Sequence, residues 1–291
     1  MSTSMLDVSH ATQNTEDVKK IVQNRYGKCA EKGGGGSCCC AGEATSSSSF
    51  AAEHGLYSQE ELSLVPKTAF SLSRGCGNPT GFANLRSGEV VVDLGCGAGI
   101  DVILAAQKVA PSGKVVGADF APQMIERAKQ AVKEAGVEDA VEFVVTDLER
   151  LELPDSLADV VISNCVINLC PDKDAVYREA FRILKPGGRL AISDVILTEE
   201  IGPQIQERFQ STWAGCVGGA IEEERYLEII KKTGFGELEI VAHHPLSPGE
   251  LEDMACCPGS EFTPAFEKED IASAQGKVVS IKFRASKPRL G

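Results

Sequence analysis

The chain has 291 residues, 43% of them hydrophobic, and a formal net charge of −13. This length predicts roughly one and a half to two domains, with enough apolar material for a sizeable core. The acidic balance opposes binding to nucleic-acid phosphates and to anionic membranes, so neither partner is expected. No apolar run is long enough for a transmembrane helix, and the start "MSTSMLDVSHATQNTEDVKK" lacks the basic and apolar regions of a secretory signal, which predicts a cytoplasmic protein.

Eleven cysteines are many for such a chain. Cytosolic thiols stay reduced, so a framework of structural disulfides is not expected. Three explanations remain open at this point, namely inert buried thiols, a metal or metalloid site, and redox chemistry.

The first 50 residues divide into two parts. "NTEDVKKIVQNRYGKCA" has its apolar residues at helical spacing, with Asn14 or Thr15 as the N-cap. "EKGGGGSCCCAGEATSSSSF" has no means of burying a core, so we expect a flexible Cys-rich arm that carries Cys38, Cys39 and Cys40.

Strands and helices alternate from about residue 88 onward. Continuous apolar runs predict buried strands, and the amphipathic runs between them predict helices. The predicted strands are residues 89–95, 114–119, 141–147, 158–164 and 188–195, and the predicted helices are 101–110, 121–136 and 172–188. This pattern is typical of a doubly wound α/β fold, in which helices cover both faces of a parallel sheet and ligands bind beyond the carboxyl ends of the strands.

The pattern changes after residue 200. The sequence predicts helices over 203–221 and 222–235 and strands over 237–244 and 277–286, and these strands can extend the sheet. We therefore expect a main domain over residues 51–200 and a smaller α+β portion over residues 201–291 that covers the ligand site.

A glycine-rich loop, "DLGCGAGID", follows the first predicted strand. Asp93 precedes Gly95, Gly97 and Gly99, which lack the Cβ atoms that would hold a ligand away from the backbone. A plain structural turn is the alternative, but three alternating glycines exceed what a turn needs. A dinucleotide fingerprint would require glycine in place of Ile100, and no Gly-Lys-Ser/Thr loop is present, so pyrophosphate binding fits poorly.

Acidic residues also end the next two predicted strands. Asp119 stands where a carboxylate can accept hydrogen bonds from both hydroxyls of a ribose. Asp147, after the third strand, is placed to reach an adenine amino group. A nucleoside-containing ligand is therefore expected over the glycine loop.

The segments "VVDLGCGAGID", "VVGADFAPQMIERAK" and "LKPGGRLAISDV" resemble the class I S-adenosylmethionine-dependent methyltransferases over about residues 85–200. The resemblance implies a Rossmann-like sheet of seven strands, with S-adenosylmethionine over the glycine loop. The cofactor-binding residues that it implies are Asp93, Gly95, Gly97, Gly99, Asp119, Met124, Asp147, Leu148 and Asn164.

Three cysteines lie where chemistry is expected. Cys165 follows the fourth strand, Cys76 lies in "SRGCGNPTG" before the first strand, and Cys216 lies in "STWAGCVGGAI" after the fifth. Each alone can be an inert buried thiol. Zinc usually takes four ligands, often from closely spaced Cys pairs, whereas these three are far apart and lack a fourth donor. Three soft thiolates instead suit a soft pyramidal centre such as trivalent arsenic.

The cysteine segments "RGCGNP", "SNCVINL" and "WAGCVGGAI", with "NRYGKCA", "GGGGSCCC" and "MACCPGSEF" near the ends, resemble the arsenite S-adenosylmethionine methyltransferases. The resemblance implies that Cys76, Cys165 and Cys216 bind arsenic during repeated methylations that detoxify it. It also implies a thiol relay at Cys38, Cys39 or Cys40, and glutathione or thioredoxin as reductant. Arg74 departs from the tyrosine that many members carry before "GCG".

The remaining cysteines carry weaker expectations. Cys96 is expected to pack as a small residue and Cys170 to have no role, whereas Cys256 and Cys257 are surface thiols or accessory ligands. A monomer is the default expectation. The alternative functions are C-methylation of a quinone- or sterol-like molecule, which would leave the three thiols unused, and a non-catalytic thiol protein that binds a metalloid or zinc.

Overall fold

The computed structural model describes residues 15–31, 55–70, 72–73, 75–202, 205, 216–255 and 268–289. The predictions made for Cys38, Cys39, Cys40, Cys256, Cys257 and Arg74 concern residues outside these ranges. Among the described helices, none combines the length and the apolar character needed to cross a bilayer.

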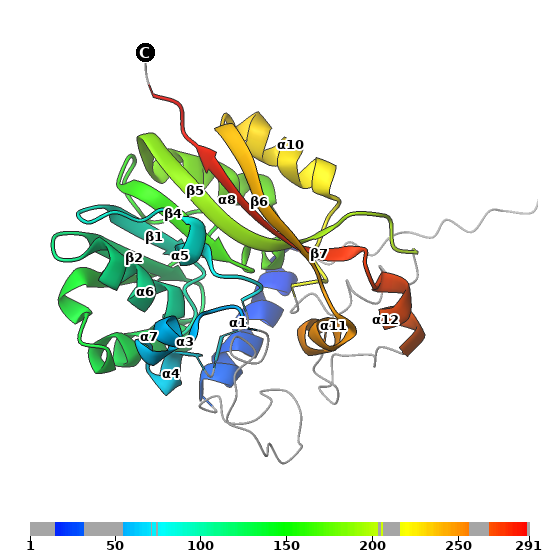
Figure 1. The fold of residues 1–291 in the computed structure, drawn as a ribbon, viewed down its shortest axis with the longest axis horizontal. Helices are drawn as coiled ribbons and strands as arrows, with labels where there is room; N and C mark the ends of the chain where they lie inside the picture. The colour runs from blue at the N-terminus through cyan, green and yellow to red at the C-terminus, as the bar shows by residue number, and fades with distance from the viewer. Residues whose placement is uncertain are drawn as a thin grey trace, which may run out of the picture.

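Seven strands form one sheet in the spatial order β3-β2-β1-β4-β5-β7-β6 (Figure 1). The strands are β1 (Val90–Leu94), β2 (Lys114–Asp119), β3 (Val141–Val145), β4 (Ala158–Asn164), β5 (Leu184–Leu197), β6 (Gly236–Pro245) and β7 (Val278–Ser286). Strands β1 to β5 are parallel, while β7 runs antiparallel between β5 and β6. The predicted seven-stranded α/β sheet is confirmed, and its last two strands come from the C-terminal portion.

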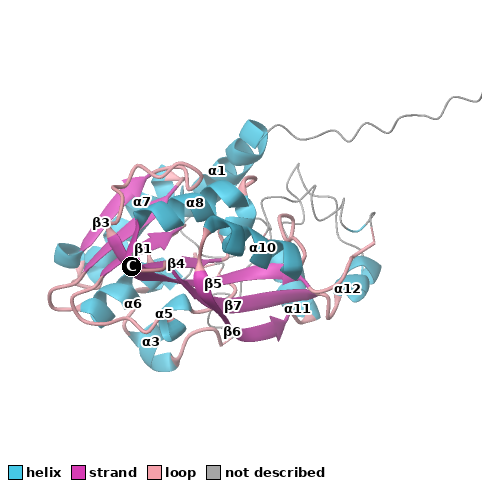
Figure 2. Ribbon diagram, turned by 90° about the horizontal axis from the view of Figure 1, so that it is seen from above, coloured by secondary structure: helices cyan, strands magenta, loops and turns pink. Residues whose placement is uncertain are grey.

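Helices cover both faces of the sheet. Figure 2 places α8 and α10 on one side of the strands and α5 and α6 on the other. The helices are α1 (Thr15–Glu31), α3 (Gln59–Ser63), α4 (Lys67–Phe70), α5 (Pro79–Phe82), α6 (Ile100–Val109), α7 (Pro122–Glu134), α8 (Lys173–Ile183), α10 (Glu223–Thr233), α11 (Pro248–Ala255) and α12 (Lys268–Ala274).

Alternation along the strands divides the core into two layers. In β1, Val91 packs into the cluster that contains α6, whereas Val92 and Leu94 pack into the cluster that contains α8 and α10. Successive side chains of a strand point to opposite faces, so a strand buried on both faces must be apolar throughout. This explains why the predicted strands are continuous apolar runs and leaves the carboxyl ends of the strands for polar residues.

Two predicted helices differ from the structure. The helix predicted over 172–188 ends at Ile183, and β5 begins at Leu184. Pro186 disfavours helical conformation in the residue before it. The N–H of Gly187 donates a hydrogen bond to the carbonyl of Lys287 and is not part of a helix. The helix predicted over 203–221 does not reach its expected end, because residues 216–219 form a turn.

Candidate active site

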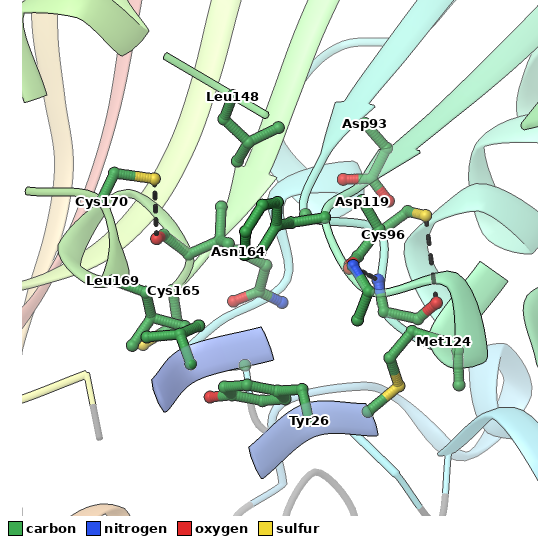
Figure 3. Close-up of a pocket in the computed structure, with 18 of the residues that line it drawn as sticks. Tyr26, Asp93, Cys96, Asp119, Met124, Leu148, Asn164, Cys165, Leu169 and Cys170 are labelled. Carbon is green, nitrogen blue, oxygen red and sulfur yellow. Dashed lines mark hydrogen bonds between the residues drawn. The ribbon is translucent and has the colours of Figure 1, made fainter. Parts of the chain in front are cut away.

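A pocket lies beyond the carboxyl ends of β1, β2 and β4, under helix α1 (Figure 3). Its empty space, counting the open mouth, amounts to roughly 1060 Å³. The predicted cofactor residues that line it are Asp93, Gly95, Gly97, Asp119, Met124, Asp147, Leu148 and Asn164. Gly99 instead begins α6, and a Cβ on it would meet that of Ala128.

The glycines of the loop serve different purposes. Gly97 has a φ of +51°, and a Cβ placed on it would meet nothing within 4 Å. The backbone at Gly97 is thus open to the pocket, where a ligand can approach it closely. Gly95 is needed for packing, because a Cβ there would lie 2.4 Å from the side chain of Val166.

Acidic side chains form the floor of the pocket. The carboxylate of Asp119 accepts hydrogen bonds from the backbone N–H groups of Gly97 and Ala121, both at 2.9 Å. Burial raises the pKa of Asp119. The pKa of Asp93 is raised strongly by burial and by the nearby carboxylates of Asp101 and Asp119. Such a floor favours a ligand that brings positive charge.

Helix α1 forms the roof of the pocket. Lys19 makes ion pairs with Asp147 at 2.6 Å and Glu149 at 2.5 Å, and Gln23 donates to the carbonyl of Phe120 at 3.0 Å. Burial lowers the pKa of Lys19, but the hydrogen bonds to both carboxylates outweigh it and raise that pKa. Asp147, which was predicted to reach adenine, is therefore paired with a lysine in this structure. The sequence predicted α1 but gave no sign that it covers the pocket.

Apolar side chains line the space between floor and roof. Met124 and Leu148 are buried in its walls, and Tyr26 extends from α1 between Met124 and the loop that carries Cys165 (Figure 3). Burial and the neighbouring Cys216 thiol raise the pKa of Tyr26, so its phenol stays protonated. An apolar slot above an acidic floor suits a flat ring attached to a charged chain.

Three cysteines gather in a buried cluster at one end of this pocket, and two of them, Cys165 and Cys216, line it. Cys76, Cys165 and Cys216 are 2%, 3% and 5% exposed and belong to the same buried cluster. The Cys216 thiol donates to the carbonyl of Cys165, with Sγ 2.9 Å from the oxygen. Burial raises the pKa of Cys165 strongly, and hydrogen bonding with the thiols of Cys216 and Cys76 raises it further. The thiol of Cys165 is therefore close to both of the others.

Backbone geometry places Cys165 at the end of β4. Its φ is +64°, which few residues other than glycine adopt, and its N–H donates to the carbonyl of Ser193 at 2.8 Å. A left-handed residue costs roughly 1–2 kcal/mol, so this site holds a thiol at some conformational expense.

Close-packed glycines place the other two thiols. A Cβ on Gly77 would lie 2.1 Å from Oγ of Ser193, and a Cβ on Gly219 would lie 1.8 Å from the carbonyl oxygen of Asn168. The loops of Cys76 and Cys216 can therefore approach the strand ends only because glycines accompany the cysteines. The motifs "GCG" and "CVGG" contain this signal, although sequence alone does not name the surfaces that the glycines contact.

The three thiols are close together but do not form a closed metal site. Among the residues that the structure describes, no group of three or more His, Cys, Asp or Glu side chains has the arrangement of a metal centre. A ligand held by all three sulfurs would thus have to draw the side chains together.

Cys96 is buried against β2, where a Cβ on Gly117 would lie 3.0 Å from its sulfur, and Cys170 also lines the pocket.

Comparison with known proteins agrees with this geometry. A methyltransferase-domain family model matches residues 85–234. The arsenite methyltransferase of Halobacterium salinarum is 38% identical over 238 residues, which make up 79% of this chain and 60% of that protein. The 27-O-demethylrifamycin SV methyltransferase of Amycolatopsis mediterranei is 30% identical over 82% of this chain and 86% of that protein.

A solved structure is also similar. The arsenic(III) S-adenosylmethionine methyltransferase of Chlamydomonas reinhardtii matches with a TM-score of 0.60 and 25% identity, over 84% of this chain and 75% of that one. The chain spans about 60% of the length of the Halobacterium protein. The predicted resemblance to arsenite methyltransferases is thus confirmed, and the chain belongs to the methyltransferase-domain family with the class I S-adenosylmethionine-dependent fold.

Proposed function

We propose that the protein transfers methyl groups from S-adenosylmethionine to trivalent arsenic held by Cys76, Cys165 and Cys216. One observation carries the proposal. Three loops that are far apart in the sequence bring their cysteines into one buried cluster. Two of these cysteines, Cys165 and Cys216, line the pocket whose floor holds the glycine loop and Asp119. Similarity to arsenite methyltransferases supports the same conclusion.

The pocket fits the cofactor of the family. When bound, S-adenosylmethionine supplies an electrophilic methyl group on a sulfonium, which a lone pair on arsenic can attack. Asp119 would hold the ribose and Gly97 would let the cofactor approach the backbone, while Met124 and Leu148 would line the adenine slot. The buried acidic floor, including Asp93, would offset the positive charges of the cofactor.

The raised pKa of Cys165 favours arsenite over zinc. Arsenite is a neutral molecule near pH 7, and each thiol that replaces one of its hydroxyls releases one water, so three thiols bind it with no change in charge. Zinc requires thiolates, and a buried Cys165 with a raised pKa resists losing its proton. Zinc also usually takes a fourth ligand. The site therefore suits a neutral trivalent centre.

The chain would act mainly by holding two reactants. The three sulfurs would keep the arsenic lone pair available, and this lone pair carries no proton, so no general base is needed. Positioning of two bound reactants can contribute about 7–11 kcal/mol. Uptake of a methyl cation raises arsenic formally from trivalent to pentavalent. Its return takes two electrons, which we assign to a thiol reductant such as glutathione or thioredoxin. Repeated rounds would give mono-, di- and trimethylated products and detoxify arsenic.

Product analysis tests the proposal directly. Purified protein incubated with arsenite, S-adenosylmethionine and glutathione should form methylated arsenicals and one S-adenosylhomocysteine for each methyl group transferred, as measured by chromatography. Samples without arsenite, or with a quinone or sterol in its place, should form no S-adenosylhomocysteine. A protein that binds the cofactor but leaves arsenite unmethylated would refute the proposal, and methylation of an organic acceptor would favour the rival function.

The affinity for arsenite should depend little on pH. Because burial keeps Cys165 protonated well above its usual pKa, arsenite binding should release no proton and vary by less than about threefold between pH 6 and pH 8. Cadmium, which binds thiolates, should gain about tenfold in affinity per pH unit for each proton released. Titration followed by thiol absorbance measures the affinities for both arsenite and cadmium. A steep rise of arsenite affinity with pH would contradict the neutral-exchange chemistry.

A further inference from the structure

Asn164 connects two of the three cysteines. It is the last residue of β4, and the chain continues directly into Cys165. Its side-chain oxygen Oδ1 accepts hydrogen bonds from the backbone N–H groups of Cys76 at 3.0 Å and Gly77 at 3.2 Å. Asn164 is thus joined to Cys165 by the peptide bond and to Cys76, 88 positions earlier in the chain, by a hydrogen bond.

The other half of the same amide is also occupied. Its nitrogen Nδ2 donates to the carbonyl of Gly77 at 2.7 Å, to the hydroxyl of Tyr57 at 3.0 Å and to the carboxylate of Asp101 at 3.0 Å. The Tyr57 hydroxyl in turn donates to Asp101, and both side chains are buried. A side-chain amide has two N–H groups and one oxygen with two lone pairs. These contacts therefore leave the amide no hydrogen bond for a cofactor.

The fit between the amide and the Cys76 loop is tight. A Cβ on Gly75 would lie 2.3 Å from Nδ2 of Asn164, so only glycine allows the loop to rest on the amide. The opposite side of the loop is held by Ser280, whose hydroxyl donates to the carbonyl of Cys76 at 2.8 Å. Cys76 is thereby fixed against β4 on one side and β7 on the other. Buried, fully satisfied networks of this kind define one geometry.

We propose that Asn164 is a positioning residue that sets the Cys76 sulfur relative to the Cys165 sulfur, so that a trivalent centre meets three thiols instead of two. This inference rests on the proposed function, because it assumes that these thiols bind the substrate. Tyr57 and Asp101 hold the amide in the required orientation. Asn164 would then act on arsenic coordination and affect cofactor affinity only weakly.

The test compares arsenic coordination in the wild type and in Asn164→Ala. X-ray absorption of the arsenite-loaded protein should give three sulfurs per arsenic in the wild type and two in the variant. The dissociation constant for arsenite should rise about 10–100-fold, as is usual when a partner that orients a ligand is lost. The affinity for S-adenosylmethionine should change by less than about threefold, a split that general destabilisation would not produce.

Two further variants make the test specific. Ser163→Ala is the matched control, because Ser163 is a buried polar neighbour on β4 whose hydroxyl donates only to the carbonyl of Leu94, at 3.1 Å, and it should keep three sulfurs. Asn164→Asp serves if the alanine variant does not fold. It keeps the size of the side chain but places a carboxylate against the Gly77 carbonyl and Asp101, and it should also lose the third sulfur.

The outcomes separate the two proposals. Fewer than three sulfurs in the wild type would overturn the arsenic ligand set and this inference with it. Three sulfurs and unchanged arsenite affinity in both Asn164 variants would overturn the positioning role and leave the proposed function intact. A large loss of cofactor affinity with intact arsenic coordination would also overturn it, since Asn164 would then be a cofactor ligand.

Discussion

Replacing Cys165 with serine (Cys165→Ser) is expected to lower the rate of arsenite methylation at least about 100-fold, because displacing a reactant by about 1 Å can already cost that much. The hydroxyl is a harder and weaker donor to arsenic than the thiol. Cys165 interacts with the thiols of both Cys76 and Cys216, so its replacement removes the one thiol that adjoins both of the others. Serine can adopt the same left-handed backbone conformation that Cys165 has. We therefore expect the fold and the affinity for the cofactor to stay nearly unchanged.

Initial rates and cofactor titrations measure this effect. The control is Cys170→Ser, since Cys170 lines the same pocket five positions later but donates only to the carbonyl of Val166, with Sγ 3.8 Å from the oxygen. We expect that variant to keep at least half of the wild-type rate. Normal turnover by Cys165→Ser would exclude the thiol of Cys165 as an arsenic ligand.

The substitution Asp119→Asn is expected to weaken the affinity for S-adenosylmethionine about 10–100-fold. Hydrogen bonds to a charged group are worth about 1.5–3 kcal/mol, and the amide would lose one of the two acceptors needed for a pair of ribose hydroxyls. The loop would also lose part of its support, because both carboxylate oxygens accept backbone N–H groups, from Gly97 and Ala121. Arsenite binding to the thiols should be preserved.

Isothermal titration with the cofactor measures this loss. Asp159→Asn is the matched control. Asp159 also accepts a backbone N–H, from Val90, and pairs with Lys185, but it lies at the start of β4, away from the pocket. Its affinity for the cofactor should stay within about twofold of the wild type. An unchanged affinity in Asp119→Asn would refute the ribose-binding role.

Much of the fold was accessible from the sequence because it depends on local patterns. The buried strands are continuous apolar runs, and β2 and β4 have the predicted bounds. The end of α8 was predicted too far along the chain. Pro186 and the two glycines after it predict the end of the helix, whereas β5 already begins at Leu184. Which of two adjoining elements takes such residues depends on the neighbouring strand.

The candidate site was less accessible, because it depends on contacts between distant segments. The motif "SNCV" places Asn164 at a strand end but does not reveal that its amide holds the Cys76 loop. The pattern of α1 predicts a helix, yet Lys19 meets Asp147 across 128 positions of sequence. The positions of the three cysteines around the predicted ligand site, and then the resemblance, suggested that they act together, whereas their spacings in the sequence carry no such information.

Part of this pocket lies outside the segment that defines its family. The domain match begins at residue 85, whereas α1, with Tyr26 and Lys19, and the loop of Cys76 come earlier in the chain. A relative that aligns with 82% of this chain is named for an organic substrate, 27-O-demethylrifamycin SV. Classification by the shared domain alone would therefore group enzymes by their methyl donor. The acceptor is better inferred from the cysteines themselves, of which Cys76 precedes the matched segment while Cys165 and Cys216 lie within it. All three positions are therefore the place to look when sorting relatives.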